Sequence, residues 1–291
     1  MMKNLIIDPC VPYGYTGCIY GIRKLAIKYG DILSFRKTGM STRGRNIYLV
    51  RLGKGRRKIL LVGGMHGREY VTTGFLLACL EYYSYLYTQD EELCGYRIKD
   101  VLSEYSFYAL PQCNPDSTEI ALGREKPLFC QKDFCAVMYK DNAKGVNINA
   151  NFPFEWTQVP DFRHPGKFAA SERETKNLII LCRKYSFEKM LSLHCRGGCI
   201  YWRDGKNGIV AQDETLAKKL NNVCGFTLCE STNEKAAYSG GFENWFRYEF
   251  KRPGLCVELI KNDNAPFDMC CKNFYEYTDW QRTKKLLAAI L

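Results

Sequence analysis

The sequence lacks the features that carry a chain into or across a membrane. No apolar run approaches the roughly 18 residues that a membrane helix needs. The first nine residues contain neither an apolar core segment nor the small-residue cleavage site of a secretory signal. We therefore expect no membrane partner and a cytoplasmic location.

Internal repeats and linkers rich in Pro or Ser are also missing, and no stretch has the composition of a disordered segment. The chain has 291 residues, of which 46% are hydrophobic. A chain of this length can bury a self-sufficient core. We expect one domain over residues 1–291.

The spacing CxxC, which many zinc and redox motifs share, does not occur among the 15 cysteines. Most of these cysteines lie inside apolar runs, where a thiol acts as a small hydrophobic group. Their odd number, with no secretory signal, favours free thiols in a reducing cytoplasm. Cys130 with Cys135, and Cys270 with Cys271, stay open as less favoured redox or metal pairs.

Acidic residues are outnumbered, and the formal net charge is +11. The Lys and Arg residues are scattered, which disfavours a nucleic-acid site, and we expect no nucleic-acid partner. Their tightest cluster, residues 54–58, lies between two apolar runs and is predicted to form a hairpin tip. The charge is consistent with a solubilising surface or with attraction of an acidic partner such as a small polycarboxylate.

Helical and strand patterns alternate along the chain. They predict strands over 46–52, 58–64, 106–110, 189–194 and 254–260, and helices over 16–29, 72–87, 171–185, 213–224 and 274–291. Ser171 and Glu174 are expected to form a capping box, and Asn114-Pro115-Asp116 a turn. The alternation predicts an α/β fold with parallel strands inside, helices on both faces, and a site beyond the carboxyl ends of the strands.

Histidine is scarce, with only His66, His164 and His194 in the chain. His66 directly follows a predicted buried strand, and Glu69 stands three residues later at the start of a helix, so both can point to one place. His194 ends another strand. Two imidazoles and one carboxylate with a fourth position open match a catalytic zinc site. On spacing alone, a structural role for these histidines stays open.

Several motifs, in order along residues 15–290, resemble those of the zinc carboxypeptidase family. These motifs are Gly39-Met40-Ser41 with Gly44-Arg45, Gly64-Met65-His66-Gly67-Arg68-Glu69, Asn114-Pro115-Asp116-Ser117, Gly145-Val146-Asn147-Ile148-Asn149-Ala150-Asn151-Phe152-Pro153, Ser171-Glu172-Arg173-Glu174-Thr175, His194, Tyr238-Ser239-Gly240-Gly241 with Asn244-Trp245, and Val257-Glu258-Leu259. The resemblance implies a single domain with a mixed, mostly parallel central sheet of about eight strands. It also implies one Zn²⁺ per chain, held by His66, Glu69 and His194.

The resemblance further implies a peptidase in which Glu258 is the general base for the attack of water on an amide carbonyl. The oxyanion that develops there needs a cation. Lys140 is the best positional match to the arginine that the family uses, and Arg68 and Arg124 are alternatives.

Three more residues match positions around the substrate. Asn149 corresponds to a residue that binds the substrate carboxylate, and Tyr238 to a mobile tyrosine that closes over the substrate. Asn147 stands where the family has an aspartate that orients the first zinc histidine. Its amide oxygen can still accept the imidazole N–H, but without charge, and a loss of this kind typically costs about 10–100-fold in metal affinity or activity.

Ala150 stands where typical carboxypeptidases have an arginine that clamps the terminal carboxylate, which alanine cannot do. One branch of the family lacks this arginine too. Its members, bacterial γ-D-glutamyl-diaminopimelate peptidases, carry Gly-Gly-Phe-Lys-Asp-Trp-Phe before the general base, which Gly240-Gly241-Phe242-Glu243-Asn244-Trp245-Phe246 resembles.

This resemblance implies an acidic muropeptide as substrate, and Arg68, Arg124, Arg247, Arg196 and Arg203 are candidates to bind its carboxylates. Two alternatives stay open, a general metallocarboxypeptidase acting on ordinary C-termini and a catalytically impaired zinc-fold binding module.

Overall fold

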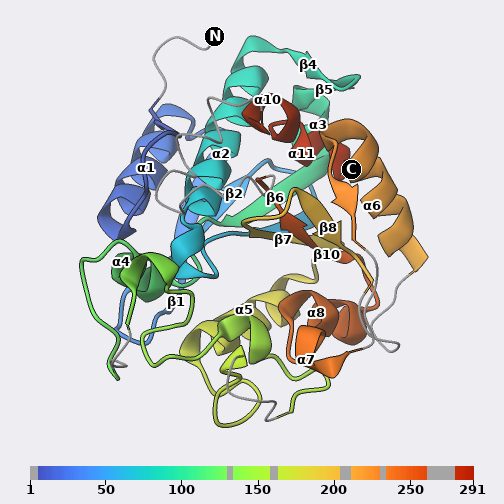
Figure 1. Ribbon diagram of the computed structural model, residues 1–291. Coiled ribbons are helices and arrows are strands. Elements are labelled where there is room, and N and C mark those ends of the chain that lie inside the picture. Colours follow the sequence, from blue (N-terminus) through green and yellow to red (C-terminus); the bar gives the residue numbers. More distant parts are fainter. Residues whose placement is uncertain (1–5, 130–133, 158–162, 204–210, 230–233, 261–278) are drawn as a thin grey trace.

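An eight-stranded mixed sheet lies at the centre of the protein (Figure 1). The computed structural model describes residues 6–129, 134–157, 163–203, 211–229, 234–260 and 279–291. The strand order is β1-β2-β6-β3-β7-β10-β8-β9. The strands are β1 (Leu33–Met40), β2 (Asn46–Leu52), β3 (Arg57–Val62), β6 (Tyr105–Leu110), β7 (Lys189–His194), β8 (Cys199–Tyr201), β9 (Thr227–Leu228) and β10 (Gly254–Glu258), with a separate ladder of β4 (Glu92–Leu93) and β5 (Tyr96–Arg97).

The four central strands, β6, β3, β7 and β10, run parallel to one another. The pairs β1–β2, β2–β6 and β8–β10 are antiparallel. The expected mixed α/β sheet of about eight strands is confirmed. The predicted hairpin tip at residues 54–58 is wrong, because β6 lies between β2 and β3 and pairs with both.

Register brings the carboxyl ends of the central strands to one edge. Val62 on β3 pairs with Leu110 on β6 and with Ser192 on β7. Glu258, the last residue of β10, pairs with His194, the last residue of β7. The segments that leave these strands therefore begin close together, which places the candidate site.

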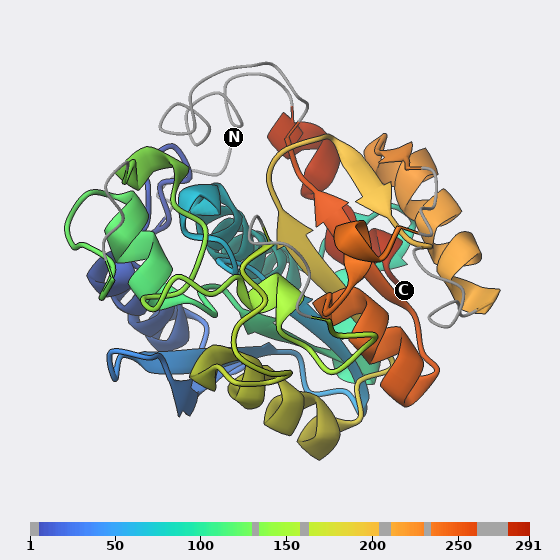
Figure 2. The same ribbon diagram turned by 60° about the horizontal axis from the view of Figure 1, so that its bottom comes forward.

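Helices cover both faces of the sheet, as the alternation of patterns predicts (Figures 1 and 2). Their bounds are α1 (Tyr15–Lys28), α2 (Val71–Gln89), α3 (Ile98–Glu104), α4 (Pro115–Ala121), α5 (Arg173–Tyr185), α6 (Ala211–Cys224), α7 (Lys235–Tyr238), α8 (Phe242–Phe250), α10 (Asp279–Thr283) and α11 (Leu286–Ala289), with short 3-10 turns η1 (Gly67–Glu69), η2 (Ala136–Met138) and η3 (Ile148–Ala150). Among the described helices, none combines the length and apolarity needed to cross a membrane.

Alternation along the strands divides the core into two layers. On β3, Ile59 and Leu61 pack with α1, α2, α6 and α11, whereas Leu60 and Val62 pack with α5 and α8. Figure 2 brings the second face forward, with α5 in olive and α8 in orange in front of the sheet. A strand with both faces buried is a near-continuous apolar run, which explains why the central strands were recognisable in the sequence.

Two local predictions are wrong. Ser171 and Glu174 form no capping box, because α5 begins at Arg173 and the Glu174 carboxylate accepts the backbone N–H and the hydroxyl of Thr42, at 2.6 and 3.2 Å. The expected turn at Asn114 is the start of α4, with the Asn114 side chain as N-cap and Pro115 in the first turn.

The closing helix predicted over 274–291 is divided in the described residues into α10 and α11. Residues 274–278 lie outside the described residues, as do Cys130, Cys270 and Cys271 of the two cysteine pairs. Cys135 is an exposed free thiol.

Candidate metal centre and active site

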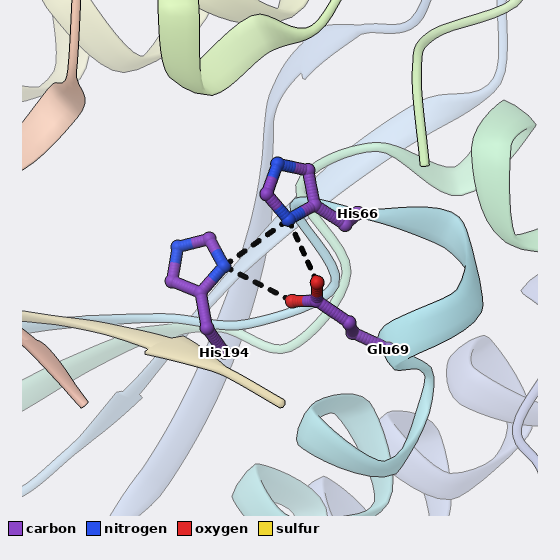
Figure 3. Close-up of side chains that lie close together, drawn as sticks. All are labelled: His66, Glu69 and His194. Atoms are coloured by element: carbon purple, nitrogen blue, oxygen red, sulfur yellow. Dashed lines mark hydrogen bonds and ion pairs between the residues drawn. The ribbon is translucent and has the colours of Figure 1, made fainter. Parts of the chain in front are cut away.

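The side chains of His66, Glu69 and His194 converge on one point (Figure 3). Glu69 Oε1 lies 2.9 Å from His66 Nδ1, and Glu69 Oε2 lies 3.0 Å from His194 Nδ1. The two Nδ1 atoms are 3.2 Å apart. Residues separated by 125 positions therefore present three donor atoms to a common centre.

The turn after β3 brings two of these donors together. His66 has extended backbone, and the single turn η1 then returns Glu69 to the same side, with its backbone N–H donating to the His66 carbonyl at 3.1 Å. Thr72 holds the turn, because its hydroxyl donates to the Glu69 carbonyl and accepts from the Gly64 N–H, both at 2.8 Å. Gly64 has φ +60°, and a Cβ there would lie 2.9 Å from the Gln112 Cα.

The outer nitrogens of both imidazoles face acceptors, which leaves Nδ1 for a metal. His66 Nε2 lies 3.0 Å from Asn147 Oδ1, and His194 Nε2 lies 3.0 Å from Ser192 Oγ. A proton on each Nε2 satisfies these contacts and turns each Nδ1 lone pair toward Glu69. Such a bond at the remote nitrogen is how proteins fix the tautomer of a metal-binding histidine.

The donor set fits Zn²⁺. Two imidazole nitrogens and one carboxylate, with room for one more ligand, match catalytic zinc. Donors about 2.0–2.1 Å from one ion at tetrahedral angles lie about 3.3 Å from one another. The observed separations of 2.9–3.2 Å are close to that figure. Zinc could therefore bind here without large movements of the three side chains.

Electrostatics favour a cation at the centre. Burial raises the pKa of Glu69, but His66 and His194 outweigh this and hold it far below its usual range. Burial likewise lowers the pKa of His194, but hydrogen bonding and charge from Glu243 and Glu69 reverse the effect and raise it well above the ordinary value. The centre is thus a buried carboxylate held ionised by its neighbours.

Glu258 stands beside this centre at the end of β10. Gly197 packs against it so closely that a Cβ on Gly197 would lie 3.2 Å from the Glu258 Cβ. Within the described residues, Glu258 Oε2 has no hydrogen-bond partner. Burial, followed by the charges of Glu69 and Glu243, raises the pKa of Glu258 to about 8, whereas His194 and Arg68 act in the opposite direction. A dication nearby would also lower the pKa of Glu258.

Of the three basic residues that are candidates to polarise the substrate carbonyl, Arg68 and Lys140 lie near the turn η1. Arg68 is next to Glu69, its backbone N–H donates to the Tyr139 carbonyl at 2.8 Å, and its charge acts on Glu258. Lys140 is partly exposed and follows Tyr139. Arg124 lies beside the start of α1 instead. Its guanidinium donates to Glu119 Oε1 at 3.3 Å, and the same carboxylate oxygen accepts the first backbone N–H of α1.

A family model described as zinc carboxypeptidase matches residues 20–274. The chain belongs to the zinc carboxypeptidase family. This confirms the resemblance found in the motifs and assigns the chain to a family of zinc metallopeptidases.

Individual relatives agree with this assignment. The chain is 24% identical over 270 residues to gamma-D-glutamyl-L-diamino acid endopeptidase 1 of Lysinibacillus sphaericus. The matched region covers 87% of this chain and 66% of that protein. The chain thus spans just under two thirds of that relative.

Solved structures show the same fold. Bovine thrombin-activatable fibrinolysis inhibitor, in complex with tick carboxypeptidase inhibitor, matches with a TM-score of 0.76 and 18% identity, covering 97% of this chain and 96% of that one. The murein-tripeptide amidase MpaA of Escherichia coli O157 matches with a TM-score of 0.52 and 17% identity, covering 88% of this chain and 90% of that one.

In this member of the zinc carboxypeptidase family, Asn147 and Asn149 stand between the candidate metal centre and α8. Asn147 Oδ1 accepts the Asn149 backbone N–H at 3.0 Å as well as facing His66. Asn149 Oδ1 accepts the Phe242 backbone N–H at 2.8 Å, and its Nδ2 lies 3.5 Å from His194 Nε2. Tyr238 is buried, and its hydroxyl donates to a Glu155 carboxylate oxygen at 2.8 Å.

Arg247, expected to bind a substrate carboxylate, is instead committed to the interior. It is 1% exposed, and its guanidinium donates to the carbonyls of Trp202 and Gly254, at 3.0 and 2.7 Å, and to the Asn244 amide oxygen. Asp213 is the nearby countercharge, at 3.8 Å. These contacts fasten α8 to β10, and a substrate cannot reach the guanidinium without opening the core.

The remaining candidates lie nearer the surface. Arg196 is partly exposed and lies in the loop after His194, joined to Cys195 by a cis peptide bond. Arg203 is exposed and stacks over the Trp202 ring at 5.6 Å. His164, the third histidine, pairs with Asp141 rather than joining the metal centre.

Ala150 is completely buried, and Gly240 explains why. Gly240 has φ +67°, and a Cβ there would overlap the Ala150 carbonyl oxygen. Its carbonyl accepts the Phe152 N–H and its N–H donates to the Phe154 carbonyl, both at 2.9 Å. Close backbone packing therefore ties the segment before α8 to the segment that carries Asn147 and Asn149.

Replacing Gly240 by Ala should lower the free energy of unfolding by about 2–4 kcal/mol, since the left-handed φ costs about 1–2 kcal/mol and the overlap with Ala150 a further 1–2. Gly123→Ala is the matched control, because Gly123 has φ +71° and a Cβ added there would meet nothing within 4 Å. Urea unfolding should place Gly123→Ala between wild type and Gly240→Ala. Equal losses in the two variants would contradict the role of the Ala150 contact.

Sequence reasoning missed Ser192 and Glu243 as partners of His194. Glu243 is buried, and its Oε1 lies 3.6 Å from His194 Nε2. A signal was present, because Glu243 stands where the related branch has lysine in its Gly-Gly-Phe-Lys motif. Asn244 also departs from this motif, where the branch has aspartate, but only position 243 reverses the sign of its charge, and such a reversal indicates a different partner.

Proposed function

We propose that this chain is a zinc-dependent metallopeptidase that hydrolyses an amide bond with Glu258 as general base. The observation that carries the proposal is the convergence of His66, Glu69 and His194 on one point beside Glu258. A purely structural role for these four residues would not explain why two imidazole nitrogens lie 3.2 Å apart beside one buried and one partly buried carboxylate.

The reaction needs water, a base and a partner for the carbonyl oxygen. When bound, zinc supplies Lewis acidity, which activates water and polarises a carbonyl. Glu258 accepts the proton of the attacking water through its unpartnered oxygen and returns it to the leaving amine. Burial raises the pKa of Glu258 and bound zinc would oppose this rise, so the two effects together favour a group that both accepts and releases a proton near neutral pH.

Arg68 is our first candidate for the cation that stabilises the developing oxyanion, ahead of Lys140. Arg68 is adjacent to a metal ligand, and its charge acts on the general base. Arg124 is placed third because of its pairing with Glu119. Asn149, which accepts the Phe242 N–H at the start of α8, and Tyr238 remain proposed contacts of the substrate.

We infer that the substrate is a γ-D-glutamyl-diaminopimelate peptide of the bacterial cell wall. Three observations support this. Ala150 is buried and cannot clamp a terminal carboxylate as arginine does. The names of the Lysinibacillus sphaericus relative and of MpaA refer to γ-D-glutamyl and murein peptides. A net charge of +11 would attract a substrate that carries several carboxylates. The cytoplasmic location stays a prediction.

A peptide panel tests the substrate. With zinc fully loaded, L-Ala-γ-D-Glu-diaminopimelate should release diaminopimelate with kcat/KM at least about tenfold above that of the α-linked isomer, a difference of about 1.4 kcal/mol in the barrier. Product analysis by mass spectrometry identifies the bond. Faster cleavage of ordinary α-linked C-termini would favour a general carboxypeptidase. Tight binding of the panel with no cleavage would favour a binding module.

A further inference from the structure

The buried carboxylate of Glu243 faces the back of a metal-binding imidazole. Glu243 is 6% exposed, and its Oε1 lies 3.6 Å from Nε2 of His194, the nitrogen that points away from Glu69. This oxygen has no hydrogen-bond partner within the described residues. A buried carboxylate oxygen is costly unless a nearby charge or donor compensates it, and His194 Nε2 lies within ion-pair distance.

Ser192, Asn149 and Glu243 lie within 3.6 Å of His194 Nε2. Ser192 Oγ lies 3.0 Å away and can accept a proton. Asn149 Nδ2, at 3.5 Å, is a donor, since its Oδ1 is used by the Phe242 N–H, and so it cannot accept one. A metal on Nδ1 requires the proton to be on Nε2. Of these groups, only Glu243 can meet that proton with a negative charge.

The two imidazoles are supported unequally. His66 Nε2 faces the neutral amide oxygen of Asn147, whereas His194 Nε2 faces a hydroxyl and a carboxylate. Ser192 can accept a hydrogen bond from Nε2 and donate its own O–H to the Glu243 carboxylate, so the carboxylate acts both directly and through Ser192. A carboxylate at the remote nitrogen raises the basicity of a ligating imidazole and fixes its orientation.

We propose that Glu243 is a positioning residue of the metal centre, which holds His194 in the metal-binding tautomer. Glu243 gives His194 a negatively charged partner, whereas His66 faces the neutral amide of Asn147. The inference rests on the proposed zinc centre. It assigns a role to α8, whose placement over Ala150 by Gly240 brings this carboxylate into the site.

A competing interpretation uses the same atoms differently. His194 Nε2, Glu243 and Cys256 also lie close enough to hold an ion of their own. Zinc on both nitrogens of His194 would require a doubly deprotonated imidazole, whereas a positioning role requires the proton on Nε2. The positioning role therefore predicts one zinc per chain, and two zinc ions per chain would overturn it.

Zinc affinity, measured by competition with a chelator, tests the role without depending on turnover. Glu243→Gln keeps the shape but removes the charge, and should weaken zinc binding by about 10–100-fold. Glu249→Gln, an exposed position on the same helix, should bind zinc as wild type does. Folding of each variant is checked by circular dichroism and unfolding in the absence of zinc.

A rescue separates charge from packing. Adding Asn147→Asp to Glu243→Gln places a carboxylate on the other imidazole, and should recover about tenfold of the lost affinity. A packing defect at position 243 would not be repaired from position 147. If Glu243→Gln does not fold, Glu243→Asp keeps the charge but withdraws it by one methylene, and zinc binding should be several-fold weaker than in wild type.

The outcomes distinguish this inference from the proposed function. Wild-type zinc affinity in folded Glu243→Gln or Glu243→Asp, alongside zinc that is lost in His66→Ala, would overturn only the role of Glu243. A wild-type chain that binds no zinc at His66 would overturn the metal centre itself.

Discussion

Glu258→Gln should lower kcat/KM by about 10²–10⁴-fold, the usual worth of a positioned general base, while the chain keeps one zinc. Glutamine has nearly the same shape but cannot accept the proton that the attacking water must lose. Because Glu258 lies beside the ligands and is not one of them, its loss should not reduce the zinc content. Steady-state kinetics on the γ-D-glutamyl peptide and elemental analysis of the same preparation measure the two quantities.

Measuring both stability and activity of Glu258→Gln separates a functional role of Glu258 from a structural one. Desolvation raises the pKa of the partly buried Glu258 to about 8, so removing its charge relieves an electrostatic cost, and Glu258→Gln should be at least as stable as wild type in the absence of zinc. Lost activity with retained stability is the pattern of a functional residue. The exposed Glu249, again changed to Gln, is the control for the substitution itself. Activity close to that of wild type in Glu258→Gln would rule out the general-base role.

Much of the fold could be predicted because the central strands are buried on both faces. Runs such as Lys58–Val62 and Lys189–His194 are apolar enough to identify a strand without knowledge of its neighbours. The order of the strands could not be predicted in the same way. The chain leaves β2 for β3 through a short basic segment that suggests a hairpin, but β6, the strand between them, arrives only after α2 and α3.

The convergence of His66, Glu69 and His194 was predictable for a different reason. His66 and Glu69 are close in sequence, and histidine is so scarce that His194 was the obvious third candidate for a metal ligand. Charged residues whose partners are distant in sequence were not predictable. Arg247 was expected to bind the substrate, because its neighbours in sequence do not indicate that it is buried and hydrogen-bonds α8 to β10. Glu174 was expected to cap its own helix, but Thr42, 132 positions away, provides its partners.

His66→Ala should weaken zinc binding by about 10²–10³-fold and abolish measurable hydrolysis. The estimate follows if a total zinc binding free energy of about 10–16 kcal/mol is shared equally among four ligands, three from the protein and one water, which gives roughly 2.5–4 kcal/mol for each. The loss should exceed that of Glu243→Gln, because a donor atom is removed and not merely its support. Chelator competition measures the affinity on the same scale for both.

His164→Ala is the matched control, since it removes the same side chain from a position that pairs with Asp141 outside the centre. The two variants should also differ in how zinc stabilises them. Zinc at about 100 times its dissociation constant stabilises a folded chain by about 2.7 kcal/mol, so wild type and His164→Ala should gain this much while His66→Ala gains little at the same concentration. Equal zinc affinity in the two histidine variants would mean that the ion binds elsewhere, because a donor that lies 2.9 Å from Glu69 and 3.2 Å from His194 cannot be removed from a shared centre without effect.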